Sequence, residues 1–149
     1  MNVDKSILDL VNKSDKKILA IWAYDCAEKI LPYFEKKYPK DNRPRKAIET
    51  LQTWIKTGIF SMAVIRKASL DAHAAARKVG EDNPARSAAR AAGQAVATAH
   101  VSRHSIGAAN YALQAIYRAT NFYDADGAIA KERGWQYKHL IELRKIKVN

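Results

Sequence analysis

The sequence has little of what stabilises small secreted proteins or anchors a chain in a membrane. Cys26 is the one cysteine among 149 residues, so no disulfide can form within the chain. That composition suits a reducing cytoplasm, where we expect the protein to reside. No apolar run approaches the ~20 residues of a membrane span. The N-terminal segment carries Asp4 and Asp9 around a short apolar patch, which is too acidic for a signal peptide.

Strand patterning is absent as well, since no segment shows a clear alternation of apolar and polar residues. Apolar residues recur at helical spacing instead, so the sequence predicts an all-α fold. A chain of 149 residues fits one domain, 1–149. It is long enough to bury roughly 68–70% of the surface that its unfolded form exposes, so it needs no metal or disulfide to hold a core.

Proline, glycine and capping residues divide the chain into about six predicted helices. Pro32 should kink or divide the first of them, because proline lacks an N–H and collides with the preceding turn. Gly58 and Gly80 are natural helix ends, and Asn83-Pro84 is a strong helix start. The predicted ranges are 15–38, 44–58, 61–79, 84–100, 102–120 and 128–147.

The predicted helix 84–100 differs from the others because alanine and glycine line two of its sides. Small side chains let neighbouring helices approach closely, so we expect this helix at the centre of the fold. Its remaining stripe is Arg86, Arg90 and Gln94, which share a face at four-residue spacing.

A polar seam is predicted between the helices that carry these residues. His73 and Arg77 share one face of the helix 61–79, and together with residues of the next helices they form the set His73, Arg77, Arg90, Gln94, His100 and His104. One interpretation is a site for a ligand or partner. The other is a hydrogen-bonded seam that fixes helix register, and we favour it because buried polar groups must be satisfied whatever the function.

A metal site is the least favoured interpretation of the histidines. His100 and His104 lie four residues apart, and His73 or Asp71 would have to supply a third ligand. The intervening Val101-Ser102-Arg103 resembles a helix junction, and Arg103 would place a positive charge beside the metal. We therefore expect no metal, no cofactor and no catalytic residue, with a histidine-based metal-dependent enzyme as the weakest alternative.

The net charge is +11, from 26 Lys and Arg against 15 Asp and Glu. Such an excess favours acidic partners, with nucleic acid among them. Lys36, Lys37, Arg43 and Arg45 form a candidate basic patch. The basic residues are otherwise spread along the chain, so a basic helical nucleic-acid-binding protein stays an alternative.

Most aromatic residues fall on predicted packing faces, and Phe122-Tyr123 is the exception. This pair sits at a turn between predicted helices, close in sequence to Arg118 and Arg133. Exposed aromatic rings near arginine are typical of a protein interface.

The segments RPRKAIETLQTWIKTG, DAHAAARK and ARSAARAAGQAVATAHVSRHSIGAANYAL resemble a family of small all-helical bacterial immunity proteins of polymorphic toxin systems. The resemblance covers residues from Asp41 to Ile116. It implies a non-enzymatic protein that binds a cognate toxin and blocks it. The positions that match the motif are His73, Arg77, Arg90, Gln94, His100 and His104, with Arg43 and Pro44 at the head of the second predicted helix.

The net charge bears on what kind of toxin the resemblance implies. Inhibitors of nucleases usually present an acidic surface, and a chain of net charge +11 would be repelled by a basic nuclease. The implied toxin is therefore acidic or membrane-acting, or the contact surface is locally acidic.

Overall fold

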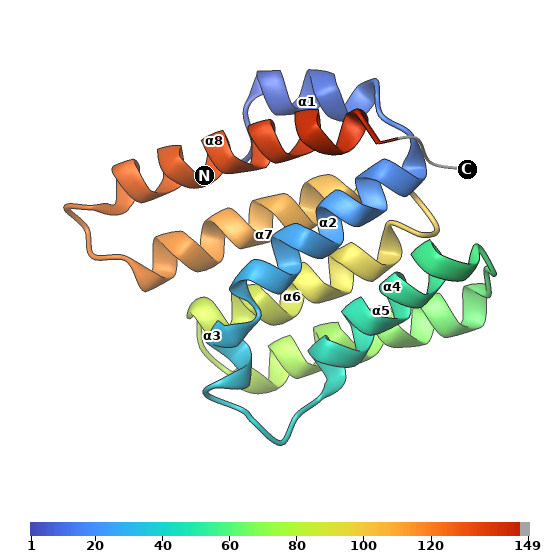
Figure 1. Ribbon diagram of the computed structural model, residues 1–149. Coiled ribbons are helices and arrows are strands. Elements are labelled where there is room, and N and C mark those ends of the chain that lie inside the picture. Colours follow the sequence, from blue (N-terminus) through green and yellow to red (C-terminus); the bar gives the residue numbers. More distant parts are fainter. Residues whose placement is uncertain (147–149) are drawn as a thin grey trace.

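The computed structural model describes residues 1–146, and that part of the chain contains helices and no strand, as the all-α prediction requires. The helices, in chain order, are α1 (Lys5–Asn12), α2 (Lys16–Ile30), α3 (Pro32–Glu35), α4 (Arg43–Thr57), α5 (Met62–Val79), α6 (Pro84–Ala97), α7 (His104–Ala119) and α8 (Ala125–Arg144) (Figure 1).

Helix α1 is a correction to the prediction, which began the first helix at Asp15. Asp4 caps α1 by accepting a hydrogen bond from the backbone N–H of Ile7, and Ile7 and Val11 are buried. A helix of 8 residues is marginal alone, so tertiary packing must stabilise it. That packing is against α8, as Figure 1 shows.

Proline divides the first predicted helix instead of kinking it. Helix α2 ends at Ile30, and α3 begins at Pro32, which occupies its first position. The missing N–H of proline costs nothing in a first turn, where that donor has no partner within the helix. With α1 added and the first helix divided, six helices is an undercount.

Several helix ends coincide with the predicted signals, while others move by a few residues. Gly58 and Gly80 end α4 and α5 in left-handed conformations, with φ of 68° and 81°. Asn83 caps α6 through a hydrogen bond from the N–H of Arg86. Helix α6 stops at Ala97 and α7 begins at His104, whereas α8 begins at Ala125, before its predicted start. The predicted end at residue 147 lies outside the described residues.

Helix α6 lies at the centre of the molecule. Helices α5 and α7 flank it, and α2, α3 and α4 also pack against it (Figure 1). Its alanines are almost all fully buried, which allows these close approaches. Arg86, Arg90 and Gln94 are half-buried, so this stripe of α6 reaches the surface between its neighbours.

No helix in the described part of the chain is long and apolar enough to span a bilayer.

Candidate functional site

Four side chains of the predicted polar seam meet where α5, α6 and α7 pack side by side. His73 comes from α5, Arg90 and Gln94 come from α6, and His104 begins α7. All of these residues are half-buried. We call these four residues the seam core.

The first pair in the seam core joins α5 to α6. The Arg90 guanidinium, at Nη1, lies 2.9 Å from Nδ1 of His73. A guanidinium can only donate, so Nδ1 must be the unprotonated, accepting nitrogen of the ring. The neutral ring then carries its proton on Nε2. This pairing holds Arg90 in place without neutralising its charge.

A glycine makes room for this histidine. The His73 ring lies against Gly93 of α6 so closely that a Cβ there would be 2.6 Å from Nε2. Ser69, one turn earlier on α5, donates from Oγ to the Gly93 carbonyl at 2.9 Å. Alanine at position 93 would push the ring away, so Gly93 sets the approach of α5 to α6.

The second pair in the seam core joins α6 to α7 in the same manner. His104 Nδ1 lies 2.8 Å from Oε1 of Gln94, so the protonated ring nitrogen donates to the amide oxygen. The Gln94 side chain passes over Gly107, where a Cβ would be 2.6 Å from Oε1. Burial lowers the pKa of His104, with a smaller contribution from His100.

Electrostatics keep the first histidine neutral. Burial lowers the pKa of His73 to about 4, and the positive charges of Arg90 and Arg77 and the proximity of His104 add to the effect. Protonating the ring would also replace the hydrogen bond from Arg90 by a contact between two cations. At neutral pH the seam core therefore carries the charge of Arg90 beside uncharged rings.

The remaining predicted seam residues lie outside these two pairs. Arg77 is exposed one turn beyond His73 on α5. His100 is exposed in the connection between α6 and α7, where its ring stacks on Phe60 with 6.2 Å between the ring centroids. The Lys16 ammonium donates to the His100 carbonyl at 3.1 Å. His100 and His104 therefore do not act as a helical pair.

The seam core holds one fixed positive charge, that of Arg90. Within residues 1–146 no group of His, Cys, Asp and Glu side chains has the arrangement of a metal site. The accepting nitrogen of His73 is already bonded to Arg90. Cys26 is buried, and burial raises the pKa of its thiol well above the ordinary value.

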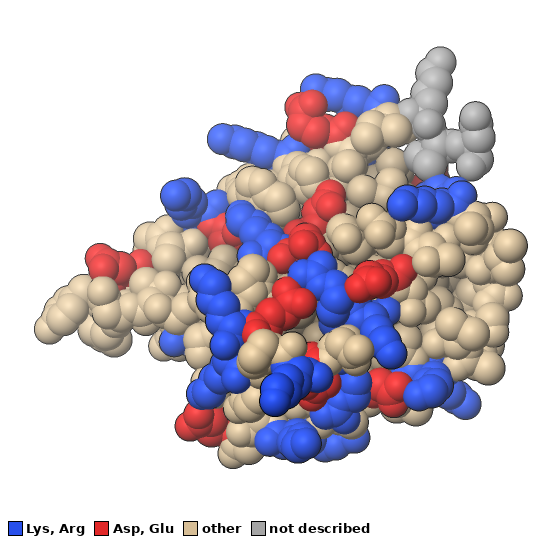
Figure 2. Space-filling model, turned by 60° about the horizontal axis from the view of Figure 1, so that its bottom comes forward, with Lys and Arg blue, Asp and Glu red and all other residues tan. Residues whose placement is uncertain are grey.

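The candidate basic patch is interleaved with carboxylates. Arg43 makes paired hydrogen bonds with Asp41, and Arg45 bridges Glu28 and Glu35 with distances of 2.6 Å to each. Figure 2 shows positive and negative side chains alternating over one face of the molecule.

The lysines of the same patch are both exposed. Lys37 pairs with Glu81 at 3.2 Å, and Lys36 is exposed. Beside the patch, a groove of about 740 Å³ runs between the connection from α3 to α4 and helix α5, with Phe34, Tyr38 and Val79 among its lining residues.

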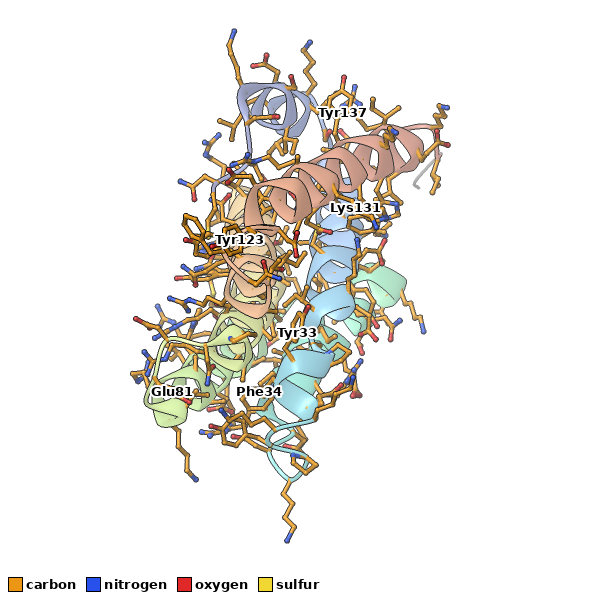
Figure 3. The ribbon with its side chains drawn as sticks, turned by 90° about the vertical axis from the view of Figure 1, so that its left-hand side faces the viewer. Tyr33, Phe34, Glu81, Tyr123, Lys131 and Tyr137 are labelled. Atoms are coloured by element: carbon orange, nitrogen blue, oxygen red, sulfur yellow. The ribbon has the colours of Figure 1, made fainter. Side chains whose placement is uncertain are left out.

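The predicted aromatic pair stands in solvent at the turn between α7 and α8. Phe122 is 86% exposed and Tyr123 is 93% exposed. Asn121 and Asp124 exchange hydrogen bonds across the pair, at 2.7 and 3.1 Å, so the turn is fixed. We call Phe122 and Tyr123 the aromatic tip. Figure 3 shows Tyr123 on a side of the molecule that also carries Tyr33 and Glu81.

The arginines predicted beside the aromatic tip are engaged elsewhere. Arg118 donates to Ser87 Oγ at 2.9 Å and reaches Asp82 at 3.5 Å, so it ties α7 to the start of α6. Arg133 donates to the carbonyl of Asn2.

A polar cluster between α2 and α8 was not predicted. His139 Nε2 lies 2.6 Å from an oxygen of Asp25, and its ring stacks on Trp135 with 4.8 Å between the centroids. Lys29 sits over Trp135 and pairs with the buried Glu132. The spacing of these residues along α8 indicates that they share one side of that helix. It does not identify their partners on α2, which are about a hundred residues away in sequence.

Of the three comparisons with known proteins, one finds a match. No curated protein and no solved structure matches the chain. The family model described as Imm-5 like putative immunity protein matches residues 9–143, which include α2 to α7 and almost all of α8. The matched range contains both the seam core and the aromatic tip, and the chain belongs to this Imm-5 like putative immunity protein family.

Proposed function

We propose that this protein confers immunity by binding a cognate toxin as a stoichiometric complex, without chemistry of its own, and that the aromatic tip is its main anchor. The family match over residues 9–143 supports an immunity role. The aromatic tip is the observation that carries the mode of action, because it is a feature of binding surfaces and has no part in the core.

The exposure of the aromatic tip needs an explanation. Burying a phenylalanine side chain stabilises a protein by about 1.5–3 kcal/mol. Folded chains therefore usually bury such a side chain in their own core. Here both rings are held away from the core by a turn that Asn121 and Asp124 clamp. A partner with an apolar socket would gain this energy on binding, with little loss of conformational entropy, because the turn is already ordered.

The experiment begins with the native protein as bait. The wild-type protein is immobilised and exposed to native cell lysate, with and without nuclease, and the retained protein is identified by mass spectrometry. That protein is then produced separately and titrated calorimetrically against the wild type. We expect a 1:1 complex that survives nuclease treatment.

The mutational arm compares two exposed connections. The double variant Phe122→Ala/Tyr123→Ala should weaken the complex by about 100-fold or more, since anchors at a hot spot are each worth about 2 kcal/mol. Ile59→Ala is the matched control, because Ile59 is 77% exposed in the connection from α4 to α5. It should leave the affinity within about twofold, as for a residue outside the interface.

Other outcomes would contradict the proposal. Retained material that disappears on nuclease treatment would favour the basic nucleic-acid-binding alternative. A wild-type protein that sediments as a dimer, and becomes monomeric in the double variant, would show that a second copy covers the aromatic tip.

A further inference from the structure

Helices α5 and α6 together present three arginines on one side of the molecule. Counted from His73, Arg66 lies seven residues earlier on α5 and Arg77 lies four residues later, so the three residues share one side of that helix. Arg90 adjoins them from α6 through its contact with His73. We call Arg66, Arg77 and Arg90 the arginine face.

The members of the arginine face differ in their partners from the arginines that form ion pairs, which are Arg43, Arg45, Arg86 and Arg118. Arg43 and Arg45 each form an ion pair with Asp or Glu. None of the ion pairs within residues 1–146 involves a member of the arginine face. Arg90 is positioned by the neutral His73 ring, so it is oriented and still carries its full charge.

Neighbouring groups add hydrogen-bond donors and no free negative charge. Gln94 uses its amide oxygen for His104, and no hydrogen bond within residues 1–146 occupies its amide nitrogen. Asp71 pairs with Lys67 at 2.7 Å, and Glu81, four residues after Arg77, pairs with Lys37 at 3.2 Å. A guanidinium with free N–H groups beside an amide donor matches the oxygens of a carboxylate.

We propose that the arginine face binds carboxylate side chains of an acidic segment on the protein partner, with Arg90 as the oriented donor and Arg66 and Arg77 as flanking charges. The identity of that partner rests on the proposed function. The net charge of +11 would steer such an acidic partner toward this chain. Nucleic acid fits less well, because carboxylates interrupt the basic residues on the face that Figure 2 shows.

The first experiment uses a defined probe. An acetylated tetraglutamate peptide is titrated into the isotopically labelled full-length protein, and the side-chain resonances of His73, Arg77 and Arg90 are followed by NMR. We expect saturable shifts at these residues and a rise in the pKa of His73. The sign follows from Coulomb's law, since a bound carboxylate offsets the positive charges of Arg90 and Arg77 that lower this pKa.

Variants that remove charge distinguish binding at the arginine face from attraction by the overall positive charge of the protein. Arg66→Gln/Arg77→Gln removes two exposed charges and should weaken peptide binding by about 10-fold or more, as expected for charged pairs. Two single-charge controls on α8, Lys131→Gln and Lys138→Gln, are combined so that the same charge is removed elsewhere, and we expect a change below about twofold. Equal losses in the two double variants, or shifts spread over the whole surface, would overturn the proposal.

Two further results distinguish this inference from the proposed function. If the purified partner binds the arginine variant as tightly as the wild type, the inference fails while the proposed function stands. If the peptide binds the arginine face but no protein partner is retained from lysate, the proposed function fails instead. A DNA oligonucleotide of equal charge that binds more tightly than the peptide would overturn the inference in favour of nucleic acid.

Discussion

Single glycines decide how the seam core is assembled. Gly93 leaves space for the His73 ring, and Gly107 leaves space for the Gln94 side chain. In both places a polar side chain from one helix covers the backbone of the next. The helices are therefore fixed in register by side-chain shape as well as by the hydrogen bonds that Arg90 donates to His73 and His104 donates to Gln94.

Gly93→Ala should destabilise the protein by about 1–3 kcal/mol, as overpacking in a well-packed core does. The new Cβ would approach His73 Nε2 to 2.6 Å, and Arg90 restrains the ring from moving. Gly134→Ala in α8 is the control, because a Cβ there meets nothing within 4 Å. It should be neutral or stabilising by up to about 1 kcal/mol, from helix propensity. Urea denaturation measures both, and equal effects would contradict this account.

The titration of His73 predicts a pH dependence of stability. Its pKa falls from 6.5 to about 4 on folding, so the unfolded chain takes up the proton first as pH decreases. The contribution of His73 is therefore complete above about pH 6.5 and is lost progressively as pH falls toward 4.

The variant His73→Asn tests this dependence, because the asparagine oxygen can accept from Arg90 but does not titrate. Between pH 6.5 and 4 the wild type should lose more unfolding free energy than the variant, as measured by urea denaturation at each pH. Parallel curves would show that His73 titrates normally. The carboxylates of Glu35 and Asp41, whose pKa values are lowered by arginine, contribute equally to both proteins.

Helices α4 and α6 are both preceded by asparagine, but only the asparagine before α6 caps its helix with a side-chain hydrogen bond. Asn83 precedes α6 and its side chain accepts from the N–H of Arg86 at 2.9 Å. Asn42 precedes α4 and makes no such bond. Both helices carry proline in their first turn, so the two positions differ mainly in the side-chain cap.

Asn83→Ala should therefore cost about 1 kcal/mol of stability, the usual value of a helix N-cap. Asn42→Ala should change stability by less than about 0.5 kcal/mol. Thermal or urea unfolding of both variants gives the comparison. A larger loss for Asn42→Ala would contradict the assignment of the working cap to α6.

Across the whole molecule, many of the basic side chains form ion pairs with neighbouring carboxylates. The +11 net charge does not produce one uniform basic surface, because carboxylates accompany Arg43, Arg45 and Arg86. The arginine face and the aromatic tip are two places where charge or apolar area stays available to another molecule. A partner that contacted both would combine charge recognition with an apolar anchor, the usual division of roles within an interface.

The all-α class, most helix positions and the central alanine-rich helix follow from the sequence alone, because helical periodicity, proline, glycine and caps are local signals. The exposed aromatic turn and the residues of the polar seam were indicated in the same way. Tertiary packing settles which seam residues meet: His73 pairs with Arg90, Gln94 pairs with His104, and His100 lies apart.

Helix α1 and the contact between Asp25 and His139 likewise depend on α8, which is distant in sequence. Periodicity reports which face of a helix is buried, whereas the partner of each side chain is set by packing between segments far apart in the chain.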